Sequence, residues 1–318
     1  MSSGNKASHT EEADLLLEKP LRRLSRVQMG LIIAVVFFGC AFLGGWWWSA
    51  LVLASIYFGQ QELEALMGNI GVKPSRIIVF STAVLMVLSA SLNKPQFISP
   101  VLTLAVIASF FRLLFRSPRA KIGDIGGTLI VVFYIIFLPV HFILLRHLGG
   151  GETLPAWQQP GLQYLCLLLS VISASDIAAY YVGRAFGKHL LYPEISPKKT
   201  REGAVGGLLG GLFLGVLNAF LWQLPLGHTL ILSALLVVVG QLGDLTESMM
   251  KREVGLKDSG ALLASHGGFL DRADSYVFSG IVCYYYIYWV MLSQGLAPEV
   301  IQWFQHLGAS VNRFIPVA

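Results

Sequence analysis

Residues 27–61 read VQMGLIIAVVFFGCAFLGGWWWSALVLASIYFGQQ, and this stretch contains no charged side chain. A helix needs about 20 apolar residues to cross a bilayer, so the stretch is long enough for two spans. Gly44 and Gly45, followed by tryptophans at positions 46–48, divide it into two halves. Tryptophan is enriched at the lipid–water boundary. The stretch therefore predicts a hairpin of two transmembrane helices.

The composition of the whole chain also favours a membrane protein. Of its 318 residues, 55% are hydrophobic and only 13% are charged, which is about half the charged share of a soluble domain. A soluble globule of this size could not bury so much apolar surface, so a soluble enzyme, a disordered chain and a nucleic-acid-binding protein are excluded. The three cysteines lie in separate apolar runs, which indicates neither a disulfide framework nor a thiolate metal site.

Further apolar runs bring the predicted number of membrane spans to nine. The fold class is therefore all-α, a polytopic helical membrane protein. Pro139 is expected to kink the fifth span. Glycines spaced by four in the seventh span, from Gly203 to Gly215, predict close packing against neighbouring helices. The runs after the first hairpin lie at 77–93, 97–115, 122–145, 161–183, 203–222, 226–246 and 275–294.

The distribution of basic residues predicts an orientation for these nine spans. With the N-terminus inside, only Lys94, Arg146 and Arg313 fall on the outer side, which leaves 20 of the 23 Lys and Arg residues inside. Cytoplasmic loops of membrane proteins carry an excess of positive charge. The sequence therefore predicts an N-in, C-out topology.

Two segments predicted on the inner side, 175–203 and 243–274, hold nine of the 18 acidic residues. Asp244 ends the eighth span and Asp271 begins the ninth, so the two carboxylates are expected at one membrane depth on antiparallel neighbours. Carboxylates with substrate phosphate oxygens are typical ligands of Mg²⁺. We therefore expect Asp244 and Asp271 to bind a divalent cation, with Asp274 and Asp176 as weaker candidates.

Basic and glycine residues accompany these carboxylates. Lys251, Arg252 and Lys257 precede a Ser-His-Gly-Gly turn at 265–268, and residues 196–200 (SPKKT) suggest a turn that presents two lysines and a hydroxyl. Each feature alone has an ordinary structural explanation, such as a solvated loop or a helix cap. Cations beside glycine-rich backbone suit phosphate binding, and their combination with paired carboxylates favours a phosphate site.

Three stretches in this region follow a recognisable pattern. Residues 248–252 are SMMKR, residues 257–260 are KDSG and residues 266–274 are HGGFLDRAD. Together with the upstream stretches 183–188 and 195–203, they resemble the phosphatidate cytidylyltransferase (CDP-diacylglycerol synthase) family. The resemblance implies transfer of a cytidylyl group from CTP to phosphatidate, giving CDP-diacylglycerol and pyrophosphate with the help of Mg²⁺.

The resemblance and the residue chemistry together give a set of expected site residues. A second, monovalent cation beside Mg²⁺ is left open. The expected catalytic residues are Asp244, Asp271, Lys251 and Lys257; the substrate-binding residues are Lys198, Lys199, Thr200, Ser248, Arg252, His266, Gly267, Gly268 and Arg272; and the metal ligands are Asp244, Asp271, Asp274 and Asp176.

Four regions and a cellular setting follow from this interpretation. The site is expected to face the cytoplasm at a bacterial inner membrane, with CTP, phosphatidate and membrane lipid as partners, no nucleic acid, and a homodimer as an option. Glu62 and Glu64, near the end of the second span, either line a cavity or cap a helix. The regions are a polar tail (1–27), N-terminal transmembrane helices (28–160), a catalytic transmembrane region (161–295) and an interfacial C-terminal segment (296–318).

Three alternative functions remain open on sequence grounds. A CTP-dependent kinase of polyprenol or phytol would release CDP instead of pyrophosphate. A CDP-transferase would act on another lipid phosphate. A transporter of anionic lipids would consume no nucleotide, and it is disfavoured because nearly all charges lie at one end of the predicted spans.

Overall fold

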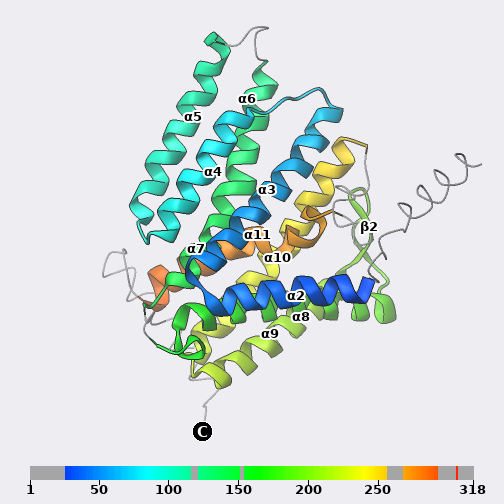
Figure 1. Cartoon of the computed structure of the whole chain (residues 1–318). Helices are drawn as coiled ribbons and strands as arrows, with labels where there is room; N and C mark the ends of the chain where they lie inside the picture. The colour runs from blue at the N-terminus through cyan, green and yellow to red at the C-terminus, as the bar shows by residue number, and fades with distance from the viewer. Residues whose placement is uncertain (1–25, 116–120, 151–153, 256–267, 293–305, 307–318) are drawn as a thin grey trace, which may run out of the picture. The chain divides into compact units, whose positions relative to one another are not determined.

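A computed structural model of the chain describes residues 26–115, 121–150, 154–255, 268–292 and 306 (Figure 1). The chain forms two compact units, residues 1–38 and 39–318. In the first unit the described residues belong to helix α2 (Arg26–Leu43), which continues into the second unit. The predicted tail and C-terminal segment lie almost wholly outside the described residues.

The first half of the second unit is a set of helices that run alongside one another (Figure 1). They are α3 (Gly45–Asn69), α4 (Arg76–Ser91), α5 (Ile98–Phe115) and α6 (Ile122–Ile130), with a short helix η1 (Pro95–Phe97) before α5. A π-helical segment, η2 (Val131–Phe137), joins α6 to α7 (Leu138–His147). Pro139 has no N–H to donate to an α-helical ladder, so the loss of regular geometry just before it agrees with the predicted disturbance of this span.

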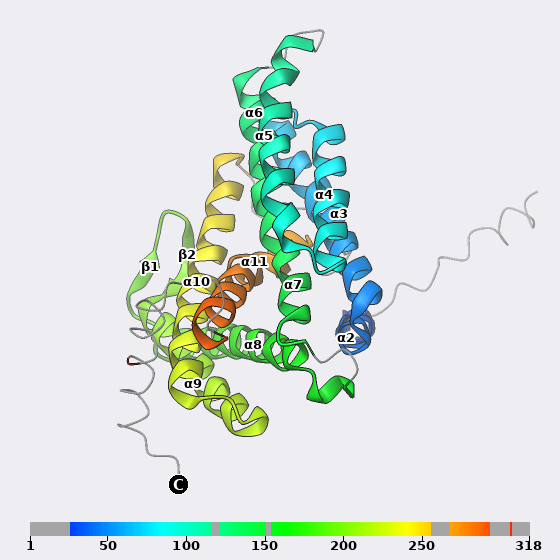
Figure 2. The ribbon, with the colours of Figure 1, turned by 90° about the vertical axis from the view of Figure 1, so that its left-hand side faces the viewer.

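The second half begins after η3 (Ala156–Gln158) and contains the longest helices. Helix α8 (Pro160–Phe186) packs along α9 (Arg201–Trp222), and α10 (Leu226–Glu253) packs on both α9 and α11 (Leu270–Tyr285) (Figure 2). Helix α11 continues as η5 (Tyr286–Met291). A Cβ added at Gly210 would lie 2.5 Å from the Ala178 Cβ, and one at Gly207 would lie 3.0 Å from the Ser175 carbonyl oxygen. The glycine stripe therefore serves helix packing, as the spacing predicted.

One connection departs from the all-α prediction. Strands β1 (Leu190–Tyr192) and β2 (Ser196–Thr200) form an antiparallel pair between α8 and α9, with Leu190 opposite Thr200. Residues 196–200 were expected to form a turn and form a strand instead. Pairing with β1 satisfies backbone groups that an open loop would leave to water, and the Arg201 N–H extends the pairing to the His189 carbonyl (2.9 Å).

Five helical segments of the described residues are long and apolar enough to cross a membrane, which confirms a polytopic membrane protein. Residues 32–43 and 76–91 form shorter apolar helices. Each of the nine predicted apolar runs falls on a helical segment. The nine-span count and the N-in, C-out orientation stay predictions. The five segments are Pro95–Arg112, Ile122–His147, Pro160–Phe186, Arg201–Trp222 and Leu226–Glu253.

Candidate active site

Two glycines of α10, Gly240 and Gly243, allow this helix to approach α11 closely beside the charged residues of both helices. A Cβ at Gly243 would lie 2.7 Å from the Asp274 carbonyl oxygen, and one at Gly240 would lie 3.2 Å from that of Ser275. Real side chains do not fit at the first of these distances. The close backbone contact brings acidic side chains of the two helices to one place.

The first group of charged side chains connects β2 with α10 through an ion pair and extends to α11. The Lys199 ammonium forms an ion pair with the Asp244 carboxylate at 2.5 Å, and the Asp244 and Asp274 carboxyl groups are within hydrogen-bonding reach of each other. Asp176, on α8, interacts electrostatically with both Asp244 and Lys199. Asp244 and Asp274, two of the four predicted metal ligands, are therefore brought together beside one predicted phosphate-binding lysine, and Asp176 lies only within electrostatic range of them.

The second group is an ionic triad of buried Glu247, buried Lys251 and half-buried Asp271. The Lys251 ammonium lies 2.6 Å from a Glu247 oxygen and 2.6 Å from a carboxylate oxygen of Asp271. Glu247 is only 1% exposed and Lys251 only 8%. The other Asp271 oxygen accepts a hydrogen bond from the Gly268 N–H (3.0 Å). Asp271 is thus engaged with Lys251 and with the start of α11.

Glu62 of α3 holds the first turn of α11 from the other side. Its two carboxylate oxygens accept hydrogen bonds from the N–H groups of Phe269 (2.8 Å) and Leu270 (2.9 Å). A carboxylate at a helix N-terminus satisfies free donors and matches the helix dipole. Of the two roles considered for Glu62, the structure assigns the capping role, to a helix more than 200 residues away in the sequence.

Tyr134 of η2 is a site residue that the sequence did not indicate. The side chain is buried, and its ring packs on that of Phe278 with centroids 5.4 Å apart. Its hydroxyl lies within electrostatic range of Glu247, Asp274 and Asp244 and has no hydrogen-bond partner in the described part of the chain. A tyrosine inside an apolar run looks like ordinary core, so no sequence signal pointed to this hydroxyl.

The remaining predicted residues have mixed surroundings. Thr200 caps α9, because its hydroxyl accepts the Gly203 N–H (3.1 Å), and the Arg252 side chain donates to the Ile195 carbonyl (3.3 Å). Lys198 and Arg272 are exposed, and Ser248 is half-buried. Lys257, His266 and Gly267 lie outside the described residues.

The donor set suits a hard divalent cation bound together with a substrate. No three His, Cys, Asp or Glu side chains of the described residues converge as a metal site. Magnesium, however, is commonly held by one or two carboxylates while substrate phosphates complete its ligands. The adjacent Asp244 and Asp274 carboxyls meet that requirement. The Tyr134 hydroxyl, which has no hydrogen-bond partner among the described residues, lies within electrostatic range of both.

Comparison with known proteins places this arrangement in a family. The family model described as the cytidylyltransferase family matches residues 24–290. The chain belongs to the cytidylyltransferase family. The matched residues of this cytidylyltransferase include Glu62 and Tyr134 as well as the charged ends of α10 and α11, so the whole site lies within the family region.

Several relatives carry the name phosphatidate cytidylyltransferase. The cytidylyltransferase is 36% identical to the Synechocystis protein over 288 residues, covering 84% of this chain and 96% of the relative. It is 31% identical to the Staphylococcus haemolyticus protein over 260 residues (80% and 94%). It is also 31% identical to a chloroplastic protein of Arabidopsis thaliana over 287 residues (82% and 71%). The family resemblance predicted from the motifs is confirmed.

Proposed function

We propose that this cytidylyltransferase transfers the cytidylyl group of CTP to phosphatidate, giving CDP-diacylglycerol and pyrophosphate. The observation that carries the proposal is the junction of β2, α10 and α11. There Lys199 pairs with Asp244 beside Asp274 in a chain whose relatives are named for this reaction. The junction combines anion-binding and cation-binding groups on a membrane protein, as a reaction between a lipid phosphate and a nucleotide requires.

The chemistry needs charge neutralisation more than it needs a base. A phosphate monoester has a second pKa of about 6, so phosphatidate is largely dianionic at neutral pH. One of its oxygens attacks the α-phosphorus of CTP. The bond between that phosphorus and the oxygen bridging to the β-phosphate breaks, and pyrophosphate leaves with the electron pair. The main obstacle is repulsion between two anions, which lysine and arginine side chains reduce.

The basic side chains of this chain are placed for that task. Lys199 comes from β2, Arg252 from the end of α10 and Arg272 from the first turn of α11. Helices α10 and α11 also carry Asp244 and Asp274. Arg252 and Arg272 are exposed and can meet a nucleotide or a lipid headgroup. In this proposal Lys199 exchanges its partner, leaving Asp244 for a substrate phosphate when both substrates bind.

The metal assignment is refined relative to the sequence expectation. We assign Asp244 and Asp274 as the Mg²⁺ ligands, because their carboxyl groups lie together. When bound there, Mg²⁺ supplies positive charge to the phosphate oxygens of CTP. Asp271 holds Lys251 and the start of α11, and Asp176 contributes negative charge from α8.

The membrane setting follows from the same reasoning. The predicted orientation places the carboxylate ends of α10 and α11 on the cytoplasmic side, where CTP is made available. Phosphatidate in the adjoining leaflet presents its headgroup at that level. We therefore infer a site at the cytoplasmic face of the cell membrane.

A product assay distinguishes this reaction from its alternatives. Purified protein in detergent is given phosphatidate, Mg²⁺ and CTP labelled at either the α- or the γ-phosphate. We expect the α-label in the lipid and the γ-label in pyrophosphate. A lipid kinase would place the γ-label in the lipid and release CDP. A transporter would leave CTP intact, and activity with other lipid phosphates but not with phosphatidate would reject the assigned substrate.

A further inference from the structure

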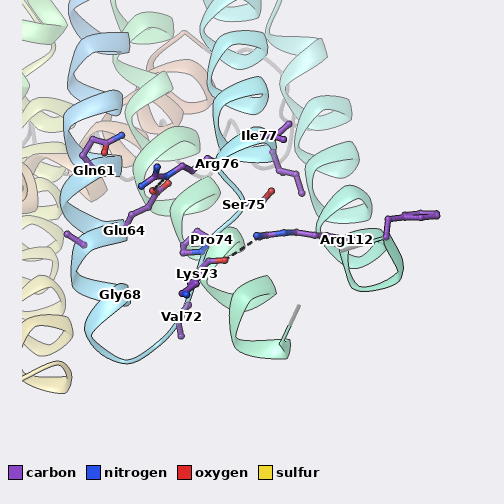
Figure 3. Close-up of a pocket in the computed structure, with 13 residues that line it drawn as sticks. Gln61, Glu64, Gly68, Val72, Lys73, Pro74, Ser75, Arg76, Ile77 and Arg112 are labelled. Atoms are coloured by element: carbon purple, nitrogen blue, oxygen red, sulfur yellow. Dashed lines mark hydrogen bonds and ion pairs between the residues drawn. The ribbon is translucent and has the colours of Figure 1, made fainter. Parts of the chain in front are cut away.

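A cavity of about 910 Å³ lies apart from the carboxylates, at the end of α3, the start of α4 and the end of α5 (Figure 3). Gln61, Glu64 and Gly68 line it from α3, and their spacing places them on one face of that helix. Glu62, which caps α11, points to a different face. The cavity therefore lies on a different face of α3 from Glu62, and its lining includes none of Asp176, Lys199, Asp244 and Asp274.

Three cations line this cavity against one carboxylate. Among the described residues that line it, Lys73, Arg76 and Arg112 are basic and Glu64 is acidic. Arg76 contacts Glu64 with Nε at 3.0 Å from the carboxylate, yet its side chain is 77% exposed. Arg112 donates to the Lys73 carbonyl at 3.3 Å, as the dashed line in Figure 3 shows. The lining carries net positive charge and has guanidinium groups, which bind phosphate oxygens well.

The backbone at two of these cations, Lys73 and Arg76, is fixed by buried side chains of α6. The Lys73 N–H donates to the Asp124 carboxylate (2.7 Å) and the Ser75 N–H donates to the Thr128 hydroxyl (2.9 Å). Asp124 and Thr128 belong to α6 and are buried. The segment between α3 and α4 is thus held in place before any ligand binds, which lowers the entropic cost of binding.

Apolar side chains continue from the cations along the outside of the helices. Ile77 is 82% exposed and Phe115 is 84% exposed, and both line the same cavity. In a membrane protein such surface faces acyl chains. A positive site at the end of a lipid-facing apolar surface matches the two parts of an anionic phospholipid, its phosphate and its acyl chains.

We propose that this cavity binds an anionic diacyl phospholipid of the surrounding membrane, with the phosphate at Arg76 and Arg112 and an acyl chain along Ile77 and Phe115. The bound lipid is distinct from the lipid that reacts, because none of the active-site carboxylates lines this cavity. The proposal does not depend on the reaction assigned above.

Native mass spectrometry of the detergent-purified protein tests this site directly. Phosphatidylglycerol is titrated, and phosphatidylcholine and inorganic phosphate are the comparison ligands. We expect saturable binding of one phosphatidylglycerol, weaker binding of phosphatidylcholine and no competition by equimolar phosphate. The double variant Arg76→Gln/Arg112→Gln should lower the affinity about tenfold or more, which corresponds to ~1.4 kcal/mol per tenfold. Lys94→Gln removes an exposed cation elsewhere and should leave the affinity unchanged.

A second variant fills the cavity without altering any charge. A Cβ at Gly68 would meet no atom within 4 Å, so Gly68→Phe places a ring in open space and should block the lipid while the protein stays folded. Equal binding of phosphatidylcholine, displacement by inorganic phosphate, or unchanged affinity in the well-folded Gly68→Phe protein would each overturn the proposal. Equal losses in Lys94→Gln and in the double arginine variant would also overturn it.

Discussion

At the scale of single residues, Lys251 is the most constrained cation of the site. It is almost fully buried between Glu247 and Asp271, and both contacts are 2.6 Å long. The carboxylates of Glu247 and Asp271 share the Lys251 ammonium. Removing the lysine would therefore leave two negative charges facing each other largely away from solvent. Removing one partner from a buried ionic group costs about 3–5 kcal/mol. Lys251 therefore has a structural role in addition to any contact with phosphate.

Lys251→Met should lower the free energy of unfolding by about 3 kcal/mol and abolish most cytidylyl transfer. Chemical unfolding in detergent and the labelled-CTP assay measure the two effects. The double variant Glu247→Gln/Lys251→Met removes one of the facing charges and should recover much of the stability but not the activity. If activity returns with stability, Lys251 acts only by positioning its neighbours.

Tyr134→Phe removes a buried hydroxyl that has no partner among the described residues. A buried hydroxyl without a hydrogen bond costs about 1–3 kcal/mol, so the variant should be as stable as the wild type or more stable. If the hydroxyl meets the substrate or its cation, kcat should fall about tenfold, the effect of one lost hydrogen bond in the transition state. Unchanged kcat in a stabilised variant would show that Tyr134 is ordinary core. Thermal unfolding and steady-state kinetics give both readouts.

At the scale of elements, the start of α11 depends on a carboxylate from α3. Glu62 is the acceptor for two N–H groups at that helix start, where Asp271 lies in the first turn and Asp274 follows it. A loose first turn would move both carboxylates. The catalytic end of the bundle is therefore coupled to the N-terminal helices through one side chain.

Glu62→Ala should cost about 1–2 kcal/mol, the usual loss for a helix cap, and should reduce cytidylyl transfer more than tenfold. The weakened capping should also speed amide exchange at Phe269 and Leu270, which hydrogen-exchange mass spectrometry can measure. Ser55→Ala, which removes a local hydroxyl-to-carbonyl bond on the same helix, is the matched control. Equal rates of amide exchange at Phe269 and Leu270 in the two variants would show that Glu62 does not cap α11.

The contact between α10 and α11 makes a second prediction at this scale. Gly243→Ala places a methyl group against the Asp274 carbonyl, which should separate the helices and cost about 1–3 kcal/mol. Gly126→Ala in α6 meets no atom within 4 Å and should have little effect. Activity and unfolding temperature should fall together in the first variant only. A fully active Gly243→Ala protein would show that the helix spacing does not set the site.

The elements were largely predictable, because hydropathy and charge are strong signals in a membrane protein. Each apolar run became a helical segment, and the glycine spacing correctly indicated packing. The β1–β2 hairpin was missed because its strands are only three and five residues long and β2 carries a proline and two lysines. The partners of charged residues were harder to predict. Glu247 and Lys251 are four residues apart and therefore share a helix face, but spacing on one helix predicts neither their burial nor their contact with Asp271.

At the scale of the whole molecule, the site is assembled from distant parts of the chain. Glu62 comes from α3, Tyr134 from η2, Lys199 from β2 and the acidic residues from α8, α10 and α11. Sequence motifs marked the C-terminal contributors, whereas the N-terminal ones lack any local pattern. The motif region therefore predicted the charged groups of the site but not the contributions of Glu62 and Tyr134.

The most direct test of the assigned metal ligands measures Mn²⁺ binding to the protein in the presence of CTP. Mn²⁺ serves as a paramagnetic substitute for Mg²⁺. Electron paramagnetic resonance of free Mn²⁺ gives the affinity without relying on turnover. We expect Asp244→Asn and Asp274→Asn each to weaken Mn²⁺ binding about tenfold or more, since each removes one of two protein carboxylates. Asp271→Asn should bind Mn²⁺ within about twofold of the wild type, because Asp271 pairs with Lys251. Wild-type affinity in Asp244→Asn, or a loss in Asp271→Asn but not in Asp274→Asn, would contradict the assignment.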